Sequence, residues 1–347
     1  MWIPRPPGQR RTEKGWCLYP MHAKQTILQL LKDTPEYISG EDISSRLGIT
    51  RAAVWKHIRA LREEGYEVDS VPNKGYRLKS LPDLVTAEEI LDGLATKRLG
   101  RSIYFFDEID STNEEAKRRG MQGAPDGSLF IAESQTMGKG RLGRAWTSPK
   151  GEGLWFSILS RSGLSPLQIS NMTLITGLSV CRAIRCQTGC EAMIKWPNDI
   201  VIGSRKVCGI LTELAAEVGR IDYIVTGIGI NVNIPSFPKE LSAKATSLQI
   251  ETGNPLRRVH LLQAILLELE GALDTFEKAP GQFPEEYRKL CVSLHKRVRF
   301  FRSGEARDGE AVDISPEGEL IVREDSGCLT PVYSGEVTVQ GIYGASL

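Results

Sequence analysis

The sequence has no long apolar run, no paired-cysteine motif and almost no excess of charge of either sign. A membrane-spanning helix needs about 18 consecutive apolar residues, so we expect a chain that does not enter a membrane. The seven cysteines are an odd number and none falls in a CxxC pair, which favours reduced thiols and a cytoplasmic location. With 44 Lys and Arg against 43 Asp and Glu, the net charge of +1 indicates no particular partner.

The even charge total hides an uneven distribution. Residues 1–80 hold 14 basic and 9 acidic side chains, whereas residues 81–347 hold 30 basic and 34 acidic ones. A basic front segment on an acidic body indicates two separate activities. Residues 1–21 are basic but lack the apolar stretch of a secretory signal, so we expect a disordered extension or a mis-assigned start.

Residues 22–80 follow the plan of a winged helix-turn-helix, a DNA-binding domain. Apolar spacing predicts helices over residues 22–32, 40–47 and 51–64, with Ser39 and Gly48 bounding the second, and then two strands around the turn at residues 72–75. A helix in the major groove and a wing on the backbone must both be basic, as they are here. The predicted DNA contacts are Arg51, Lys56, His57, Arg59 and Lys74. The alternative is a small helical bundle whose exposed face is basic by chance.

After a linker at residues 81–84, residues 81–295 alternate strand-like and helix-like segments, which predicts a mixed α/β domain. Strands are expected over residues 103–106, 128–132, 154–159, 193–196, 207–214 and 223–230. Helices are expected over residues 86–94, 113–119, 166–188 and 257–278. In residues 296–347 short strands alternate with glycine turns, which predicts a small SH3-like β-barrel. The predicted fold class is α+β with three domains.

A glycine-rich loop at residues 138–144 carries three cations, Lys139, Arg141 and Arg144. Its Gly-x-Gly-x-x-Gly pattern formally matches a dinucleotide-binding turn, but residues 146–151 follow where that turn needs a helix. The loop also lacks the Gly-Lys-Ser/Thr of a P-loop. Three close cations repel one another unless anions lie between them, and a nucleotide phosphate with a carboxylate would supply those anions. The alternative is a solvated basic surface loop.

Three strand ends place polar groups or glycines beside apolar segments. Residues 195–199 (Lys-Trp-Pro-Asn-Asp) close one strand, residues 205–211 open the next, and residues 227–233 end a third. Rigid strands hold ligand groups in place, and glycines inside apolar strands mark the close approach of a ligand or another backbone. Solvated lysines and tight sheet packing are the alternatives.

Together these segments resemble the biotin protein ligase family, and the resemblance spans residue 22 to the C-terminal barrel. It rests on residues 110–113 (Asp-Ser-Thr-Asn), 135–144, 195–199, 205–211 and 227–231. With the winged helix at residues 40–61 and 74–76, the chain is similar to the bifunctional members, which are both biotin ligases and repressors of the biotin operon. At Lys139 the family loop usually has arginine. Lysine keeps the charge without the bidentate fork, which implies weaker retention of the reaction intermediate.

The resemblance implies that biotin and ATP, with Mg²⁺, form biotinoyl-AMP and pyrophosphate. Biotin then passes to a lysine of the biotin carboxyl carrier protein of acetyl-CoA carboxylase. The implied catalytic residues are Arg141, Lys195 and Lys206. The implied biotin contacts are Ser111, Thr112, Asn113, Gln135, Lys139, Gly140, Arg141, Lys206 and Gly209. The implied nucleotide contacts are Arg144, Trp146, Lys195, Asn198, Asp199 and Asn231, with Mg²⁺ held mainly by the phosphates and Asp199 as its candidate protein ligand.

The resemblance further implies operator DNA as a partner, with biotinoyl-AMP as co-repressor and a homodimer when that ligand is bound. Two other functions stay open: a ligand-sensing repressor without ligase activity, and a ligase for a related acyl cofactor such as lipoate. The cations Arg141, Lys195 and Lys206 argue against a sensor of biotin alone, because such a sensor has no need of phosphate-binding groups.

Overall fold

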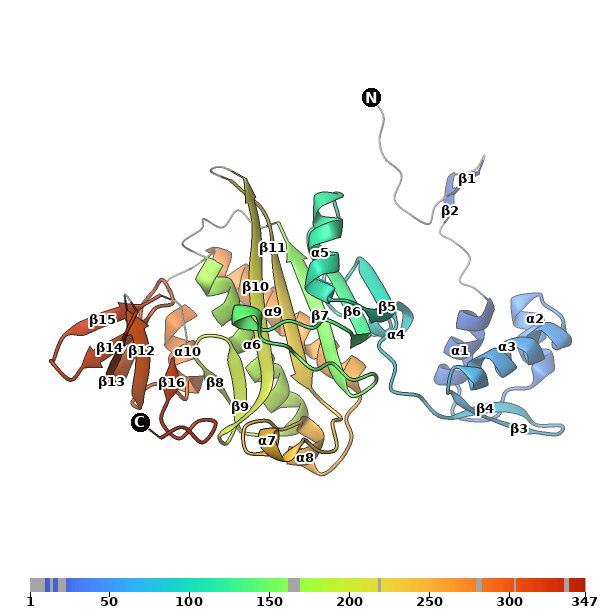
Figure 1. Cartoon of the computed structure of the whole chain (residues 1–347). Coiled ribbons are helices and arrows are strands. Elements are labelled where there is room, and N and C mark those ends of the chain that lie inside the picture. Colours follow the sequence, from blue (N-terminus) through green and yellow to red (C-terminus); the bar gives the residue numbers. More distant parts are fainter. Residues whose placement is uncertain are drawn as a thin grey trace. The chain divides into compact units, whose positions relative to one another are not determined.

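A computed structural model describes residues 10–12, 15–17, 23–161, 169–217, 220–278, 283–302, 304–333 and 337–346. The chain divides into two compact units, residues 1–83 and 84–347, and the division falls within the expected linker (Figure 1). In the leader, β1 (Arg10–Thr12) pairs antiparallel with β2 (Gly15–Cys17). The other residues of the leader, and residues 166–168 of a predicted helix, lie outside the described part of the chain.

Within the first unit, residues 23–80 form three helices and a hairpin, as predicted. These are α1 (Ala23–Asp33), α2 (Gly40–Leu47), α3 (Arg51–Glu63), β3 (Glu67–Val71) and β4 (Gly75–Ser80). Ser39 Oγ accepts the Asp42 N–H at 3.0 Å, and Gly48 ends α2 in the left-handed conformation with φ 65°. Val54, Ile58 and Leu61 are fully buried, so the predicted apolar face of α3 forms the core of this unit.

The second unit is built on a seven-stranded sheet with the strand order β5-β6-β7-β11-β10-β9-β8 (Figure 1). Its strands are β5 (Ile103–Ile109), β6 (Ser128–Gln135), β7 (Gly153–Ser160), β8 (Ala192–Lys195), β9 (Asp199–Ile202), β10 (Arg205–Glu217) and β11 (Arg220–Asn231). Strands β5 and β6 are parallel and the other neighbours are antiparallel. The sequence predicted six of these strands and missed β9; it also placed the end of β8 at Trp196, one residue too late.

Helices cover both faces of this sheet. Successive strand residues point to opposite faces: Leu129 and Ile131 join the main core with α6 (Ile169–Thr188) and α9 (Arg258–Lys278), whereas Phe130 packs beside α5 (Thr112–Met121). The α5 face is the smaller one and carries the polar residues of the 110–113 segment.

Four shorter helices complete this part of the unit: α4 (Ala87–Leu91), α7 (Lys239–Ser242), α8 (Leu248–Thr252) and α10 (Phe283–Leu290). Thr86 caps α4 as predicted, with its hydroxyl accepting the Glu89 N–H at 3.4 Å. The helix stops at Leu91 rather than Leu94, because Gly93 adopts φ 91°. Helices α7, α8 and α10 were not predicted.

The C-terminal segment forms a five-stranded antiparallel sheet in the order β15-β14-β13-β12-β16. Its strands are β12 (Arg297–Arg302), β13 (Glu305–Ile314), β14 (Leu320–Glu324), β15 (Leu329–Val332) and β16 (Thr338–Val339). Gly304, Gly318 and Gly327 have φ near 85°, which confirms the predicted glycine turns. The Trp196 indole N–H donates to the Gly318 carbonyl at 3.0 Å and joins this sheet to the end of β8.

Candidate active site and DNA-binding face

The N-terminal end of α5 is hydrogen-bonded to the end of β6, the strand that pairs in parallel with β5. Ser111, Thr112 and Asn113 are buried there. The Thr112 backbone N–H and hydroxyl donate to Gln135 Oε1 at 2.9 and 3.2 Å, and Gln135 Nε2 donates to Ser148 Oγ at 2.9 Å. Because both polar groups of the Gln135 amide have partners, its orientation is set. Ser111, Thr112, Asn113 and Gln135, which were all predicted to contact biotin, therefore lie together.

Asn113 is held by three hydrogen bonds. Ser157 Oγ donates to Asn113 Oδ1 at 2.6 Å, and Asn113 Nδ2 donates to Glu213 Oε2 at 2.7 Å and to the Leu211 carbonyl at 3.3 Å. The facing strand position is Gly227, where an added Cβ would lie 2.2 Å from Asn113 Oδ1. A glycine in the middle of β11 is thus required by the close approach of this amide.

A narrow cavity of about 50 Å³ opens beside these residues. It is lined by Ser111, Thr112, Gln135, Lys139, Gly140, Arg141, Trp146, Phe156, Asn198, Lys206, Gly209, Ile210, Leu211, Gly227, Ile228 and Gly229. The lining includes every residue predicted for biotin binding except Asn113, whose amide is used by the contacts above. Small-molecule pockets usually hold about 300 Å³ or more, so this cavity is narrower than a typical ligand pocket; residues 139–141 and Trp146 of the 138–146 loop line it.

A second cavity of about 470 Å³ adjoins the first. It is lined by Arg144, Ala145, Trp146, Thr147, Pro149, Glu152, Asp199, Lys206, Asn231, Ile234, Ser236, Phe237, Pro238, Leu241, Lys244, Ala245 and Tyr343. Four of the six residues predicted for the nucleotide line this cavity: Arg144, Trp146, Asp199 and Asn231. Asn198 lines the first cavity instead.

Trp146 and Lys206 line both cavities and form their shared wall. The Lys206 ammonium lies 5.1 Å from the centre of the Trp146 ring. Gly209 and Gly229 leave room for this pair, because a Cβ at Gly229 would lie 2.6 Å from Trp146 Nε1 and one at Gly209 would lie 3.0 Å from Lys206 Nζ. The Trp146 indole N–H is buried and has no acceptor among the described residues. A ligand oxygen in either cavity would supply that acceptor.

Several cations gather around one carboxylate at this wall. Lys206 Nζ lies 2.6 Å from Asp199 Oδ1. The Arg141 guanidinium donates to Asn198 Oδ1 at 2.9 Å, and burial lowers its pKa. Burial also lowers the pKa of Lys195, and the charges of Lys206 and Arg141 lower it further against the opposing effect of Asp199. An excess of buried positive charge favours anionic ligands such as carboxylate and phosphate.

Lys195 lies apart from both cavity linings. Its ammonium donates to the Val337 carbonyl at 3.1 Å and lies 5.2 Å from the centre of the Tyr343 ring. Both partners come from the C-terminal segment, so this segment reaches the site.

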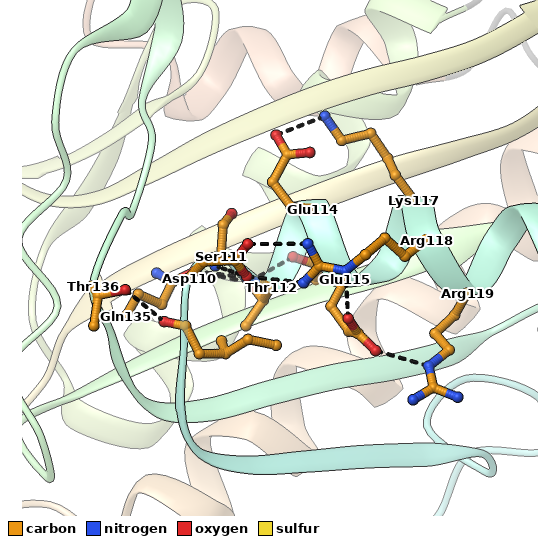
Figure 2. A network of polar contacts seen from close by, with 12 residues as sticks. Asp110, Ser111, Thr112, Glu114, Glu115, Lys117, Arg118, Arg119, Gln135 and Thr136 are labelled. Atoms are coloured by element: carbon orange, nitrogen blue, oxygen red, sulfur yellow. Dashed lines mark hydrogen bonds and ion pairs between the residues drawn. The ribbon is translucent and has the colours of Figure 1, made fainter.

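The loop that carries Lys139 contains a short 3₁₀ turn, η1 (Arg141–Gly143), with Leu142 at φ 56°. Lys139 Nζ lies 2.9 Å from Glu114 Oε1, and Lys117 Nζ lies 3.0 Å from the same oxygen. Figure 2 shows Glu114 paired with Lys117 on α5, beside a separate group in which Arg118 contacts Asp110 and Glu115, and Glu115 also contacts Arg119. The lysine that replaces the usual arginine is thus paired with an acidic side chain.

Site residues that were not found from the sequence include Ser148, Ser157, Glu213 and Tyr343. Ser157 lies between Phe156 and Ile158 in β7, and Glu213 precedes Leu214 in β10; a polar residue beside apolar ones in a strand is a signal that a period-two pattern could have revealed. Tyr343 follows the last strand and belongs to no motif that we analysed.

In the first unit, the predicted DNA contacts Arg51, Lys56, Arg59 and Lys74 are exposed, whereas His57 is half-buried. Trp55 is 53% exposed on the same helix, with the Arg59 guanidinium 5.9 Å from its ring centre. Arg59 also pairs with Glu63 at 2.9 Å, and Arg51 lies 3.6 Å from Glu41. Exposed pairs of this kind contribute little to stability and release their cations at small cost.

Nowhere in the described residues do three or more His, Cys, Asp or Glu side chains gather as a metal site would require. Every helix there is too short or too polar to cross a membrane.

Three family models match the chain. They are the biotin/lipoate A/B protein ligase family over residues 105–231, the HTH domain over residues 24–77 and the biotin protein ligase C-terminal domain over residues 294–339. The bifunctional ligase/repressor BirA of Bacillus spizizenii is 38% identical over 307 residues, which cover 87% of this chain and 94% of that protein. The protein of the same name from Escherichia coli is 32% identical over 306 residues, with coverages of 88% and 94%.

A solved structure, the biotin protein ligase from Aquifex aeolicus in complex with biotin and ATP, is similar to this chain. The two chains are 31% identical, the match covers 69% of this chain and 99% of that one, and the TM-score is 0.62. The chain combines a helix-turn-helix, a ligase and a C-terminal domain, matches bifunctional ligase/repressors over most of their length, and belongs to the biotin protein ligase family.

Proposed function

We propose that this chain is an ATP-dependent biotin protein ligase that also represses transcription by binding operator DNA. The observation that carries the ligase activity is the pair of adjoining cavities with a cationic wall between them, formed by Lys206 with Trp146. Two anionic substrates that react with each other require such a wall, because their negative charges must be brought together and neutralised.

In the first step the biotin carboxylate oxygen attacks the α-phosphorus of ATP. The bond from that phosphorus to the bridging oxygen breaks, and pyrophosphate leaves with the electron pair. Lys206 and Arg141 line the first cavity and would neutralise the carboxylate and the charge that develops on the phosphate. Both are held by partners, Asp199 and Asn198, so little reorganisation is needed during the reaction.

In the second step a lysine amine of the carrier attacks the biotinoyl carbonyl, AMP leaves, and the nitrogen releases its proton to solvent. Neither step requires a nucleophile of the enzyme. Closure of the 138–146 loop would protect the mixed anhydride from water before the carrier arrives. We expect the biotin carboxyl carrier protein of acetyl-CoA carboxylase as the partner. A relative from Mycobacterium tuberculosis, 32% identical over 231 residues, is named biotin--[acetyl-CoA-carboxylase] ligase, and the similar Aquifex structure is named a biotin protein ligase.

Mg²⁺ would enter with the phosphates of ATP, because Mg²⁺ that is bound to substrate phosphates needs only one or two protein carboxylates. Asp199 and Glu152 are the carboxylates of the second cavity that fit this requirement. Bound there, the ion would neutralise phosphate charge. Asp199 is already engaged by Lys206, so the phosphates would supply most of the ligands.

The repressor activity is supported by the basic, exposed face of α3 and by the wing tip at Lys74. We expect this face to contact the major groove and the wing to contact the backbone. A homodimer that forms on binding biotinoyl-AMP would present two such faces to a palindromic site. Such a dimer would couple the state of the ligase site to DNA affinity.

The test is to incubate the protein with ATP, Mg²⁺, biotin and a biotin carrier domain, and to measure the carrier mass. A gain of one biotinyl group supports the ligase. No gain, with a carrier that another ligase modifies, would leave a ligand-sensing repressor. A parallel reaction with lipoate in place of biotin distinguishes the lipoate ligase alternative.

A further inference from the structure

The chain continues past the region that matches the C-terminal family domain, which ends at residue 339. The described residues 340–346 form a tight turn. Gly341, Tyr343 and Gly344 have φ values of 77°, 59° and 73°, and the Gly341 N–H donates to the Ala345 carbonyl at 2.9 Å. The Tyr343 N–H donates to the carbonyl of Ser204 at 3.0 Å, in the turn between β9 and β10. The tail is thus fastened to the sheet that carries the site.

The left-handed backbone of Tyr343 is uncommon for a residue with a side chain. Such a conformation persists only where the surrounding contacts favour it, and such residues concentrate at functional sites. Gly341 and Gly344, which also have positive φ, form the other bends of this turn. The geometry places the phenol ring on the wall of the second cavity.

The Tyr343 side chain contacts the charged groups of the site. Its hydroxyl donates to Asp199 Oδ2 at 2.8 Å, while the other oxygen of that carboxylate lies 2.6 Å from Lys206 Nζ. The Lys195 ammonium lies 5.2 Å from the ring centre, within the range of a cation–π contact. Burial and the neighbouring Asp199 charge raise the pKa of the phenol, so the hydroxyl stays protonated and donates at neutral pH.

Asp199 therefore has a partner on each oxygen, Lys206 on one and Tyr343 on the other. We propose that Tyr343 is a positioning residue for the nucleotide: its hydroxyl fixes the Asp199 carboxylate of the second cavity, and its ring contacts the Lys195 ammonium. The proposal rests on the proposed ligase function, because it assigns ATP to that cavity. It places a determinant of ATP binding in a segment beyond the matched family domain.

Two variants separate the two contacts. Tyr343→Phe keeps the ring but removes the hydroxyl, whereas Tyr343→Leu removes both. We expect the KM for ATP to rise roughly tenfold in the first variant, since a hydrogen bond to a carboxylate is lost, and to rise further in the second. The KM for biotin and the kcat at saturating ATP should stay near the wild-type values, which a general loss of folding would not permit. Tyr104→Phe is the matched control, because Tyr104 lies on β5 outside both cavity linings.

Affinity for ATP is measured in the same proteins by titration calorimetry, without carrier. If the wild-type protein binds ATP but does not modify the carrier, the ligase function fails, and the calorimetric affinities still decide the role of Tyr343. A KM and an affinity for ATP that are unchanged in both variants would overturn the proposal. So would an equal loss for ATP and biotin, or no binding of ATP by the wild-type protein.

Discussion

Replacing Gly227 by alanine tests whether the Asn113 network is as rigid as its contacts indicate. The new Cβ would lie 2.2 Å from Asn113 Oδ1 and 2.8 Å from its Cγ, so the amide must move. Movement breaks its bond to the charged Glu213, worth about 1.5–3 kcal/mol, and its bonds to Ser157 and the Leu211 carbonyl, worth about 0.5–1.5 kcal/mol each. Because Glu213 retains Lys117 as a partner, we expect a net loss of about 3 kcal/mol.

The assay is thermal unfolding of the full chain, followed through the transition of the second unit. About 3 kcal/mol corresponds to a fall in Tm of roughly 6–12 °C for a unit of this size. Gly271→Ala is the control, since Gly271 is helical, exposed and has no atom within 4 Å of an added Cβ. That change should raise stability by about 0.5–1 kcal/mol, because alanine favours the helix.

Biotin affinity, measured by calorimetry, should fall in Gly227→Ala, because Gly227 lines the first cavity. A variant whose Tm lies within about 1 °C of the wild-type value, with unchanged biotin affinity, would refute the rigid placement of Asn113. Gly227→Ala should cost little further stability in an Asn113→Gly background, since that background has already lost the amide and its hydrogen bonds; such non-additivity would support the rigid placement.

Arg141→Ala should form biotinoyl-AMP slowly or release it, which a filtration assay for free intermediate detects; unchanged formation and retention would contradict the role of Arg141. Lys56→Ala should weaken operator and non-specific DNA alike and reduce the slope of log affinity against log salt by about one; a sequence-dependent loss would instead indicate a base contact. Hydrogen bonds from Lys139 and then Lys117 lower the pKa of Glu114, so its contribution to stability is present above the ordinary value of 4.5 and is lost as pH falls through the lowered pKa. Glu114→Gln should therefore flatten the acid side of the stability–pH curve, and a curve of unchanged shape would disprove this ion-pair contribution.

Much of the first unit followed from local chemistry. Ser39 and Gly48 bound α2 as expected, because a cap and a left-handed glycine act within one turn of chain. For the glycines of β11 the sequence predicted only that a ligand or another backbone lies close. It did not identify Trp146 as the neighbour of Gly229, since strand periodicity identifies a face but not the residue that packs on it.

The remaining site residues depend on contacts between distant segments. Asn113 meets Glu213 across 100 positions, and Tyr343 meets Asp199 across 144. No short-range spacing in the sequence identifies either pair. Strand β9 was missed because its four residues follow the Trp196–Asn198 turn directly, where polar site residues obscured the short apolar run.

The wall shared by the two cavities affects how long the reaction intermediate stays bound. A molecule with one half in each cavity binds its second half at a high effective concentration, so it dissociates far more slowly than either half alone. The mixed anhydride has that shape, whereas free biotin and ATP do not. Once made, it would stay bound until a carrier lysine removes it. How long the protein remains loaded would then report the supply of unmodified carrier rather than the supply of biotin, and Trp146 and Lys206 would set the length of that interval.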